Sequence, residues 1–362
     1  MKKCFQIYSV LTTLAMGSLC ASNEEGLVAA SKKMNQPAPV AAQTPAPLSK
    51  EMVPGLPCPD QWRVSADYLY FLPTIDDTYF VIDSSVSTTF PNGTRRDNEL
   101  RFHSGYRVGA EYAFCGKDRE LQAFYTHVKA DNTKQESGQF LWATVGRPDV
   151  ISDFENYNGY AKSKLQVFYQ RLDTNLSQLA LDAKGLYFYL QPGIEFASMR
   201  VDAFHHYQIK GGSTATVDQR SRSWGVGPQM GFELDYNLYH SPLSASMSHV
   251  LSLTGICSGS LLVGRSHTDN FESLNSSPLL KFKDMKSWRM IPAFHGRVML
   301  NYLIRFNKSK VGGSVGIGYE FNSYIRGRMR AVFPDDVADG LSHNNYYNFD
   351  IQGLIVSAAI QF

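Results

Sequence analysis

The sequence predicts an all-β protein, a transmembrane antiparallel up-and-down β-barrel of about ten strands. Three observations predict it. Long segments alternate between apolar and polar residues, the connections between them alternate between short and long, and the chain ends on Phe362 inside such a segment. Soluble strands average about 5–6 residues, whereas a tilted strand that spans a bilayer needs about 9–11. The alternating segment 224–238 exceeds both lengths, which is typical of a membrane barrel.

The alternation is clearest at residues 99–114, 224–238 and 288–304. In each segment, most of the residues at alternate positions are large and apolar, and many of the residues between them are Gly, Arg, Glu or Asn. A strand with this period has one apolar and one polar face. The apolar face would contact lipid and the polar face would line a lumen. Because backbone groups in hydrocarbon must all be paired, the sheet must close into a ring.

Ten strands follow in order along the chain. We predict them at 62–72, 99–114, 119–130, 164–181, 186–208, 221–239, 243–264, 287–306, 311–326 and 347–362. The connections between them are tight at 115–118, 182–185, 240–242 and 307–310, and long at 73–98, 131–163, 209–220, 265–286 and 327–346. Transmembrane barrels have short periplasmic turns and long extracellular loops. Further strands within 75–90 or 139–146 would raise the count to 12 or more.

The last strand has an apolar face formed by Phe362, Ile360, Ala358 and Val356. An unpaired apolar edge invites aggregation, so we expect this strand to pair with the first one. A terminal aromatic residue also resembles the signal by which the barrel-assembly machinery recognises precursors, and an amphipathic strand can add to the edge of a partner's sheet. Alternatively, Phe362 is only the last lipid-facing residue.

The N-terminal part has a different composition. Two lysines, an apolar segment at 4–19 and small residues at 20–22 predict a cleaved signal peptide over residues 1–22. Residues 23–60 are rich in Pro and Ala and lack periodicity, which indicates a flexible periplasmic linker. Loss of Lys2 and Lys3 reduces the 35 basic residues to 33, equal to the 33 acidic ones. This balance gives no support for nucleic-acid binding.

Charged residues on the polar faces are the candidates for lining the lumen. They are Arg101, Arg107, Glu111, Glu195, Glu233, Asp235, Arg289, Arg297, Arg305 and Glu320. Opposite charges in a lumen can select solutes. Alternatively, they pair with one another and fill a narrow interior. Aromatic girdles at the bilayer interfaces are predicted from Tyr68, Tyr70, Tyr187, Tyr189, Tyr236, Tyr302, Tyr319 and Trp288.

Three cysteines remain after removal of the signal peptide, Cys58, Cys115 and Cys257. An odd number in an exported protein points to a free thiol or an intermolecular bridge. Cys58 precedes the first predicted strand and Cys115 lies in the first tight turn, so a disulfide between them is geometrically feasible. Cys257 lies too far along its strand to reach them. No CxxC or His/Cys spacing predicts a metal site.

Four segments resemble a known family. "WRVSADYLYFLP", "FHSGYRVGAEYAF", "RELQAFYTHVKA" and above all "WGVGPQMGFELDYNL" are similar to the major outer membrane protein-like barrels of Legionella and Chlamydia-related bacteria. The resemblance extends over about residues 61–362. It implies a pore-forming outer-membrane protein with no enzymatic activity, and we expect no cofactor. The related chlamydial envelope proteins also imply disulfide-linked networks as the rival to a Cys58–Cys115 bridge.

The expected function is therefore that of an outer-membrane porin, which lets small hydrophilic solutes diffuse and contributes to the envelope structure. One alternative is a surface adhesin acting through the loops at 73–98, 131–163 and 265–286, and another is a structural barrel with a filled, non-conducting lumen. The expected partners are outer-membrane lipid, the barrel-assembly machinery, and either further copies of the chain or disulfide-linked envelope proteins.

An enzyme of the barrel protease or acyltransferase type needs acidic residues and a histidine gathered at the outer rim. Asp202, His205, His206, His267 and Asp269 supply the residue types, but their spacing is not specific. We therefore expect no enzymatic activity.

Overall fold

A computed structural model describes residues 61–114 except 85 and 88, 119–146, 154–183, 185–244, 247–306, 311–332 and 343–362. The predicted signal peptide and linker, Cys58 and Cys115 lie outside the described residues. The described part contains twelve strands: β1 (Trp62–Ile75), β2 (Tyr79–Asp83), β3 (Thr94–Asp97), β4 (His103–Ala113), β5 (Arg119–Ala143), β6 (Tyr157–Ala183), β7 (Leu186–Ile209), β8 (Thr214–Ser244), β9 (Met247–Leu274), β10 (Ser277–Phe306), β11 (Gly312–Val332) and β12 (His343–Gln361). Within it, no helix is long and apolar enough to cross a membrane.

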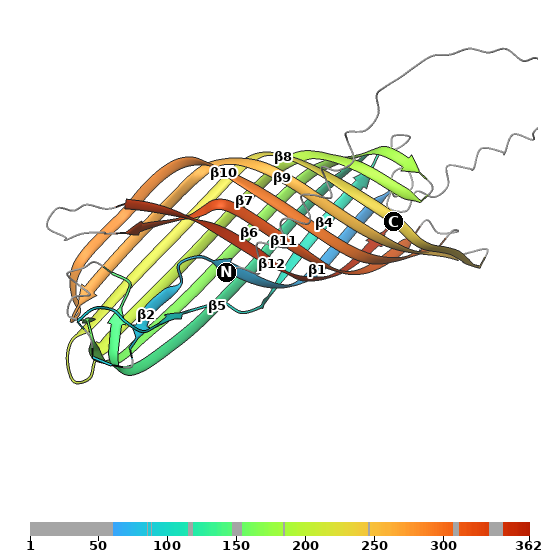
Figure 1. Ribbon diagram of the computed structural model, residues 1–362. Helices are drawn as coiled ribbons and strands as arrows, with labels where there is room; N and C mark the ends of the chain where they lie inside the picture. Colours follow the sequence, from blue (N-terminus) through green and yellow to red (C-terminus); the bar gives the residue numbers. More distant parts are fainter. Residues whose placement is uncertain are drawn as a thin grey trace, which may run out of the picture. The chain divides into compact units, whose positions relative to one another are not determined.

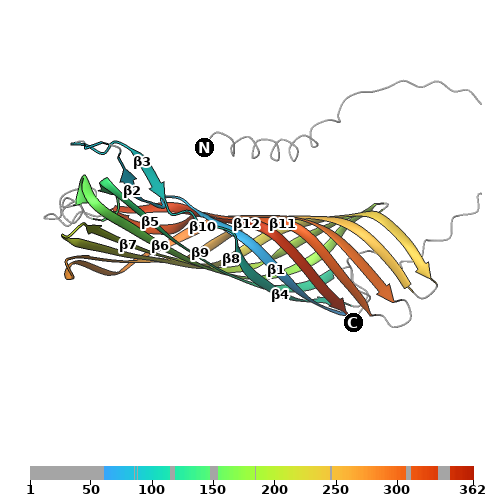
Figure 2. The ribbon, with the colours of Figure 1, turned by 90° about the horizontal axis from the view of Figure 1, so that it is seen from below.

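Ten of these strands form a closed antiparallel ring in the order β1, β4, β5 to β12 and back to β1 (Figure 1). The predicted barrel of about ten strands is therefore confirmed. β2 lies within 75–90, where a further strand was considered, but it pairs with β3 and the far end of β5 rather than entering the ring. Figure 2 shows β2 and β3 at the end of the ring opposite the C-terminus.

The two ends of the barrel domain pair with each other. The backbone nitrogen of Trp62 donates to the carbonyl oxygen of Phe362 at 2.9 Å, and the nitrogen of Phe362 donates to the oxygen of Trp62 at 2.9 Å. Phe362, Ile360, Ala358 and Val356 are exposed on the outer wall, as expected for a lipid-facing terminal strand. Closure of the ring therefore leaves no free strand edge there.

The strands are displaced along one another around the ring. Successive direct partners lead from Tyr302 through residues 315, 358, 66, 108, 125, 172, 196, 226 and 263 to Met290. The path starts at residue 302 of β10 and, after one circuit of the ring, returns to the same strand at residue 290. The shear of the ten-stranded ring is therefore 12 residues. Such a shear requires the strands to tilt relative to the barrel axis, which Figure 1 shows.

Three of the predicted outer loops are wrong in extent. Segments 131–163, 209–220 and 265–286 largely continue as strands, so that β8 has 31 residues and β10 has 30. Outside the bilayer both faces of a strand can be polar, so the apolar alternation that marks a spanning strand fades. Between β9 and β10 only Asn275 and Ser276 remain as a turn, with φ of 48° and 67°. Positive φ at both central residues is typical of a tight hairpin turn.

Side chains alternate between the outer wall and the interior as the sequence predicts. Tyr68, Tyr236, Tyr302, Tyr319 and other predicted girdle residues are exposed on the outer wall. Tyr187 and Tyr189 are exceptions, because both are buried and face inward. Their neighbours on the outer wall are Phe188 and Leu190. Both faces of this part of β7 are therefore apolar or aromatic, so the sequence does not show which face points outward.

The backbones of β8 and β9 approach each other closely at Gly264. A Cβ on Gly264 would lie 1.8 Å from the carbonyl oxygen of Trp224, whereas a Cβ on Gly255, in the same strand, would meet nothing within 4 Å. We expect Gly264→Val to lower the free energy of unfolding by about 1–3 kcal/mol or more, because the backbone must shift. Gly255→Val is the matched control and should change it little. Urea unfolding in lipid vesicles measures both, and equal effects would contradict the close approach.

Candidate functional site

The interior of the ring contains most of the predicted lumen residues. Arg107, Glu111, Glu195, Asp235 and Glu320 are buried, and Glu233, Arg289, Arg297 and Arg305 are half-buried. Arg101 differs, because β4 begins only at His103 and Arg101 is exposed before it. The alternation in the sequence extends beyond the strand, which is why Arg101 appeared to belong to the lumen face.

A buried ion pair joins β4 to β11. The guanidinium of Arg107 donates to both carboxylate oxygens of Glu320, at 2.8 and 2.6 Å, and its Nε donates to Thr126 at 2.8 Å. Asp67 on β1 lies 3.6 Å from the same guanidinium. Two-point pairing of this kind is among the stronger charged hydrogen bonds. It offsets part of the cost of removing both charges from water.

Glu195 on β7 is the centre of a second group of contacts and is fully buried. Its carboxylate accepts hydrogen bonds from Tyr324 at 2.8 Å and Ser260 at 2.6 Å, and lies 2.8 Å from Nε2 of His295. Nδ1 of His295 lies 2.8 Å from the amide oxygen of Asn322. Both ring nitrogens of His295 therefore take part in polar contacts, one with β7 and one with β11.

These contacts reach directly across the lumen. The hydroxyls of Tyr169 on β6 and Tyr324 on β11 lie 2.9 Å apart, and Arg171 on β6 donates to Asn322 on β11 at 2.8 Å. Four strands separate β6 from β11 on either side of the ring, so the two strands lie opposite each other. Because Tyr324 donates to Glu195, Tyr169 is the donor to Tyr324. The side chains thus bridge the full width of the barrel.

We call this group of contacts the central layer. Its arginines are Arg107, Arg171 and Arg297, its carboxylates are Asp67, Asp173, Glu195 and Glu320, and His295 lies beside Glu195. Above it, towards the outer end of β6, the interior is filled by apolar and aromatic side chains from most of the ring. They include Leu69, Phe71, Val167, Leu165, Phe349, Ile351 and Ile291. The interior is therefore closed first by paired charges and then by an apolar layer.

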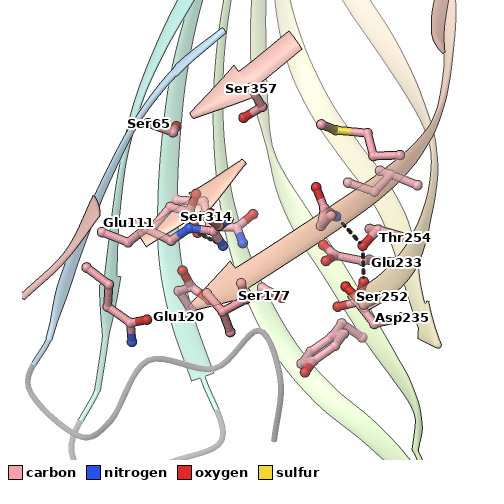
Figure 3. Close-up of a pocket in the computed structure, with 18 of the residues that line it drawn as sticks. Ser65, Glu111, Glu120, Ser177, Glu233, Asp235, Ser252, Thr254, Ser314 and Ser357 are labelled. Atoms are coloured by element: carbon pink, nitrogen blue, oxygen red, sulfur yellow. Dashed lines mark hydrogen bonds and ion pairs between the residues drawn. The ribbon is translucent and has the colours of Figure 1, made fainter. Parts of the chain in front are cut away.

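A polar cavity of about 130 Å³ lies between this central layer and the periplasmic end (Figure 3). It is lined by Glu111, Glu120, Glu233 and Asp235, by Arg63, Arg297 and Arg305, and by several serines. Arg63 lies 3.4 Å from Glu111. Oε1 of Glu120 and the hydroxyl of Tyr189 are buried without a hydrogen-bond partner in the described structure. The carboxylates, arginines and serines give this cavity a hydrophilic lining.

The outer end of the interior is also crossed by side chains. Arg330 on β11 forms an ion pair with Asp77, and Arg328 donates to the carbonyl oxygen of Asp76 at 3.1 Å. Tyr207 on β7 donates to the carbonyl oxygen of Phe80 on β2 at 2.8 Å. The segment after β1 is thereby held against the inner wall.

The residues considered for an enzyme are divided between the interior and the outer wall. His205 faces inward, whereas Asp202, His206, His267 and Asp269 lie on the outer wall, where Asp202 pairs with Arg200 and Asp269 with His267. Burial, together with the charges of Arg330 and Arg328, lowers the pKa of His205 to about 3. His205 is therefore neutral at physiological pH and a weak base. The described residues contain no cluster of His, Cys, Asp or Glu that could hold a metal ion.

Several residues of the central layer were missed by the sequence analysis. Tyr169, Arg171 and Asp173 alternate along β6 and all face inward. On the same face Leu165 and Val167 are apolar, so this strand shows no clear polar side from which the lumen could be recognised. The remaining cysteine, Cys257, is a free thiol exposed on the outer wall.

Comparisons with known proteins identify the kind of barrel. Residues 55–362 match the family described as Legionella pneumophila major outer membrane protein precursor. The chain is similar to the outer membrane protease OmpT from Escherichia coli, at 8% identity and a TM-score of 0.38, with 84% of this chain and 97% of that chain covered. It is also similar to the outer membrane protein AlkL, at 10% identity and a TM-score of 0.26, with 91% and 97% covered. No curated protein matches the chain.

The buried Arg107–Glu320 pair generates a stability prediction. Glu320→Gln leaves the Arg107 charge only partly compensated, so we expect the free energy of unfolding to fall by about 3 kcal/mol. Asp218→Asn, which breaks the exposed Arg220–Asp218 pair, should cost less than about 1 kcal/mol. Urea unfolding of refolded protein, followed by tryptophan fluorescence, compares the two variants. Equal losses would show that the central layer is not desolvated.

Proposed function

We propose that this chain, which belongs to the family of the Legionella pneumophila major outer membrane protein, is a closed envelope barrel. Its lumen does not conduct solutes in the conformation described, and its long outer strands form a rigid surface outside the bilayer. The observation that carries this proposal is the contact of Tyr169 with Tyr324, at 2.9 Å between opposite strands. Together with the paired charges beside it and the apolar side chains that fill the interior above it, this bridge would close the lumen to solutes.

The strand lengths support a surface role. A spanning strand needs about 9–11 residues, whereas β5 to β10 have between 24 and 31. Their outer halves remain paired, and β2 and β3 extend the sheet further. This paired outer part offers a fixed surface for contacts with other molecules. Outer-membrane lipid and the barrel-assembly machinery are the partners that we propose, together with further copies of the chain or disulfide-linked envelope proteins.

A porin remains the second candidate because of the cavity at the periplasmic end. Its lining of carboxylates, arginines and serines is suited to water and small hydrophilic solutes. For solutes to pass, the central layer and the apolar layer above it would have to move aside. We do not propose an enzyme, because His205 faces the interior, whereas Asp202 and Asp269 on the outer wall already pair with Arg200 and His267.

Planar-bilayer recordings of the refolded mature chain test the closed lumen. We expect the wild type to give no channel steps, because the central layer blocks the lumen. Tyr169→Ala/Tyr324→Ala/Phe349→Ala should give discrete steps, because it removes the two tyrosines that bridge opposite strands together with Phe349, the ring of the apolar layer that packs against both of them. Tyr68→Ala/Tyr319→Ala removes two exposed tyrosines of the outer wall and should stay silent.

A heat-dependent shift in electrophoretic mobility must first show that each variant is folded. Steady conductance by the folded wild type would overturn the closed lumen and favour the porin. Silence of the folded triple variant would show that the bridging residues are not what closes the barrel.

A further inference from the structure

The outer wall of β7, β8 and β9 changes from apolar side chains to tryptophan and arginine within a few residues along each strand. Phe196, Val226 and Val263 are direct partners on these three strands, and all three face outward. Two residues further out, Trp224 is the direct partner of Arg265, which is in turn the partner of Trp288 on β10. The two indole rings lie 6.0 Å apart at 75° to each other. Tryptophan at the end of an apolar wall marks the level of the lipid headgroups.

Three arginines gather at this boundary, and we call them the arginine cluster: Arg200 on β7, Arg222 on β8 and Arg265 on β9. Arg200 and Arg222 are direct cross-strand partners. Arg265 lies diagonally across from Arg222, whose direct partner is His267. In this tilted ring, each direct partner lies further from the periplasmic end than the residue it pairs with on the preceding strand, going from β7 to β9. Arg265 lies two residues closer to the periplasmic end than His267, the direct partner of Arg222. The two displacements nearly cancel, so Arg265 and Arg222 lie at nearly the same level along the barrel axis.

The cluster is held in place by aromatic rings. The guanidinium of Arg200 lies 5.2 Å from the centre of the Phe168 ring, and that of Arg265 lies 5.9 Å from the centre of the Trp288 ring. The amino group of Lys129 lies 5.4 Å from the centre of the same Phe168 ring. Such contacts fix cations against the wall without neutralising them.

Negative charge near the cluster lies on the side away from the lipid. Asp202 pairs with Arg200 at 2.5 Å, and it is two residues further out along β7. Among the described side chains, no ion pair joins Arg222 or Arg265 to a carboxylate, and Nε of Arg265 is buried without a hydrogen-bond partner. Like charges directly opposite on neighbouring strands destabilise a sheet. An anion bound between the arginines would remove this repulsion.

We propose that the arginine cluster binds the phosphate groups of phosphorylated lipids in the outer leaflet. Guanidinium groups match phosphate with two parallel hydrogen bonds. The lipid rather than free phosphate is the ligand, because the cluster follows directly on the wall of Phe196, Val226 and Val263, against which acyl chains pack. The phosphate then sits between Arg222 and Arg265, and the indoles of Trp224 and Trp288 contact the upper part of the chains.

Titration of the folded mature chain in detergent with lipid A tests this site. We expect wild-type protein to bind bisphosphorylated lipid A about tenfold more tightly than lipid A from which both phosphates have been removed. Arg222→Gln/Arg265→Gln should abolish this preference. Lys162→Gln/Lys164→Gln removes the same charge from two exposed lysines further out on β6 and should retain it. Intrinsic tryptophan fluorescence reports binding, and the heat-dependent mobility shift confirms that each variant is folded.

Three results would overturn the proposal. The first is a wild type that does not distinguish the two lipids. The second is an equal loss of preference in both double variants, which would mean that general surface charge is responsible. The third is displacement of lipid A by inorganic phosphate at equal concentration, which would make free phosphate the ligand. Arg222→Gln alone, which leaves the Arg265–Trp288 contact in place, should weaken the preference without affecting folding.

Discussion

The structure depends on one constraint, which is that no backbone amide or carbonyl can remain unpaired in hydrocarbon. The hydrogen bonds between Trp62 and Phe362 join the first strand of the ring to the last, so that neither strand has an unpaired edge there. Once the ring is closed, strict alternation follows, because each residue must face either lipid or the interior. The shear of 12 residues then sets the tilt of the strands and decides which side chains can meet inside.

The interior follows from the small number of strands. In a ring of ten, side chains from opposite strands can touch, as Tyr169 and Tyr324 do. Charges in so narrow a space have little access to water, so each needs a partner. Arg107 with Glu320, and His295 with Glu195, meet that need across two intervening strands. A wider barrel would have left the same residues separated by water.

The sequence predicts the features that depend on one strand at a time. The alternation at 224–238 located most of the spanning part of β8, and the terminal pattern located the closing strand. Features that depend on the whole ring were not predictable in this way. The partner of Arg107 is 213 positions away, and only the shear brings the two together. The outer halves of β5 and β9 were missed because their outward residues, such as Asp131 and Asp269, are polar and resemble a loop.

The same alternation explains why the outer wall can carry two different surfaces on one strand. Along β8, Val226 faces lipid, Trp224 marks the interface and Arg222 lies beyond it, all on one side of the pleat. Each step is two residues, or about 7 Å along the strand, so the change from apolar to cationic occurs within the thickness of a headgroup layer. Because β5 to β10 continue outward as paired strands, the position of Arg222 relative to Arg200 and Arg265 is fixed by backbone hydrogen bonds. A loop carrying the same arginines would lose conformational entropy when it became ordered on binding. The strands of this wall are already ordered by folding, so binding does not carry that cost.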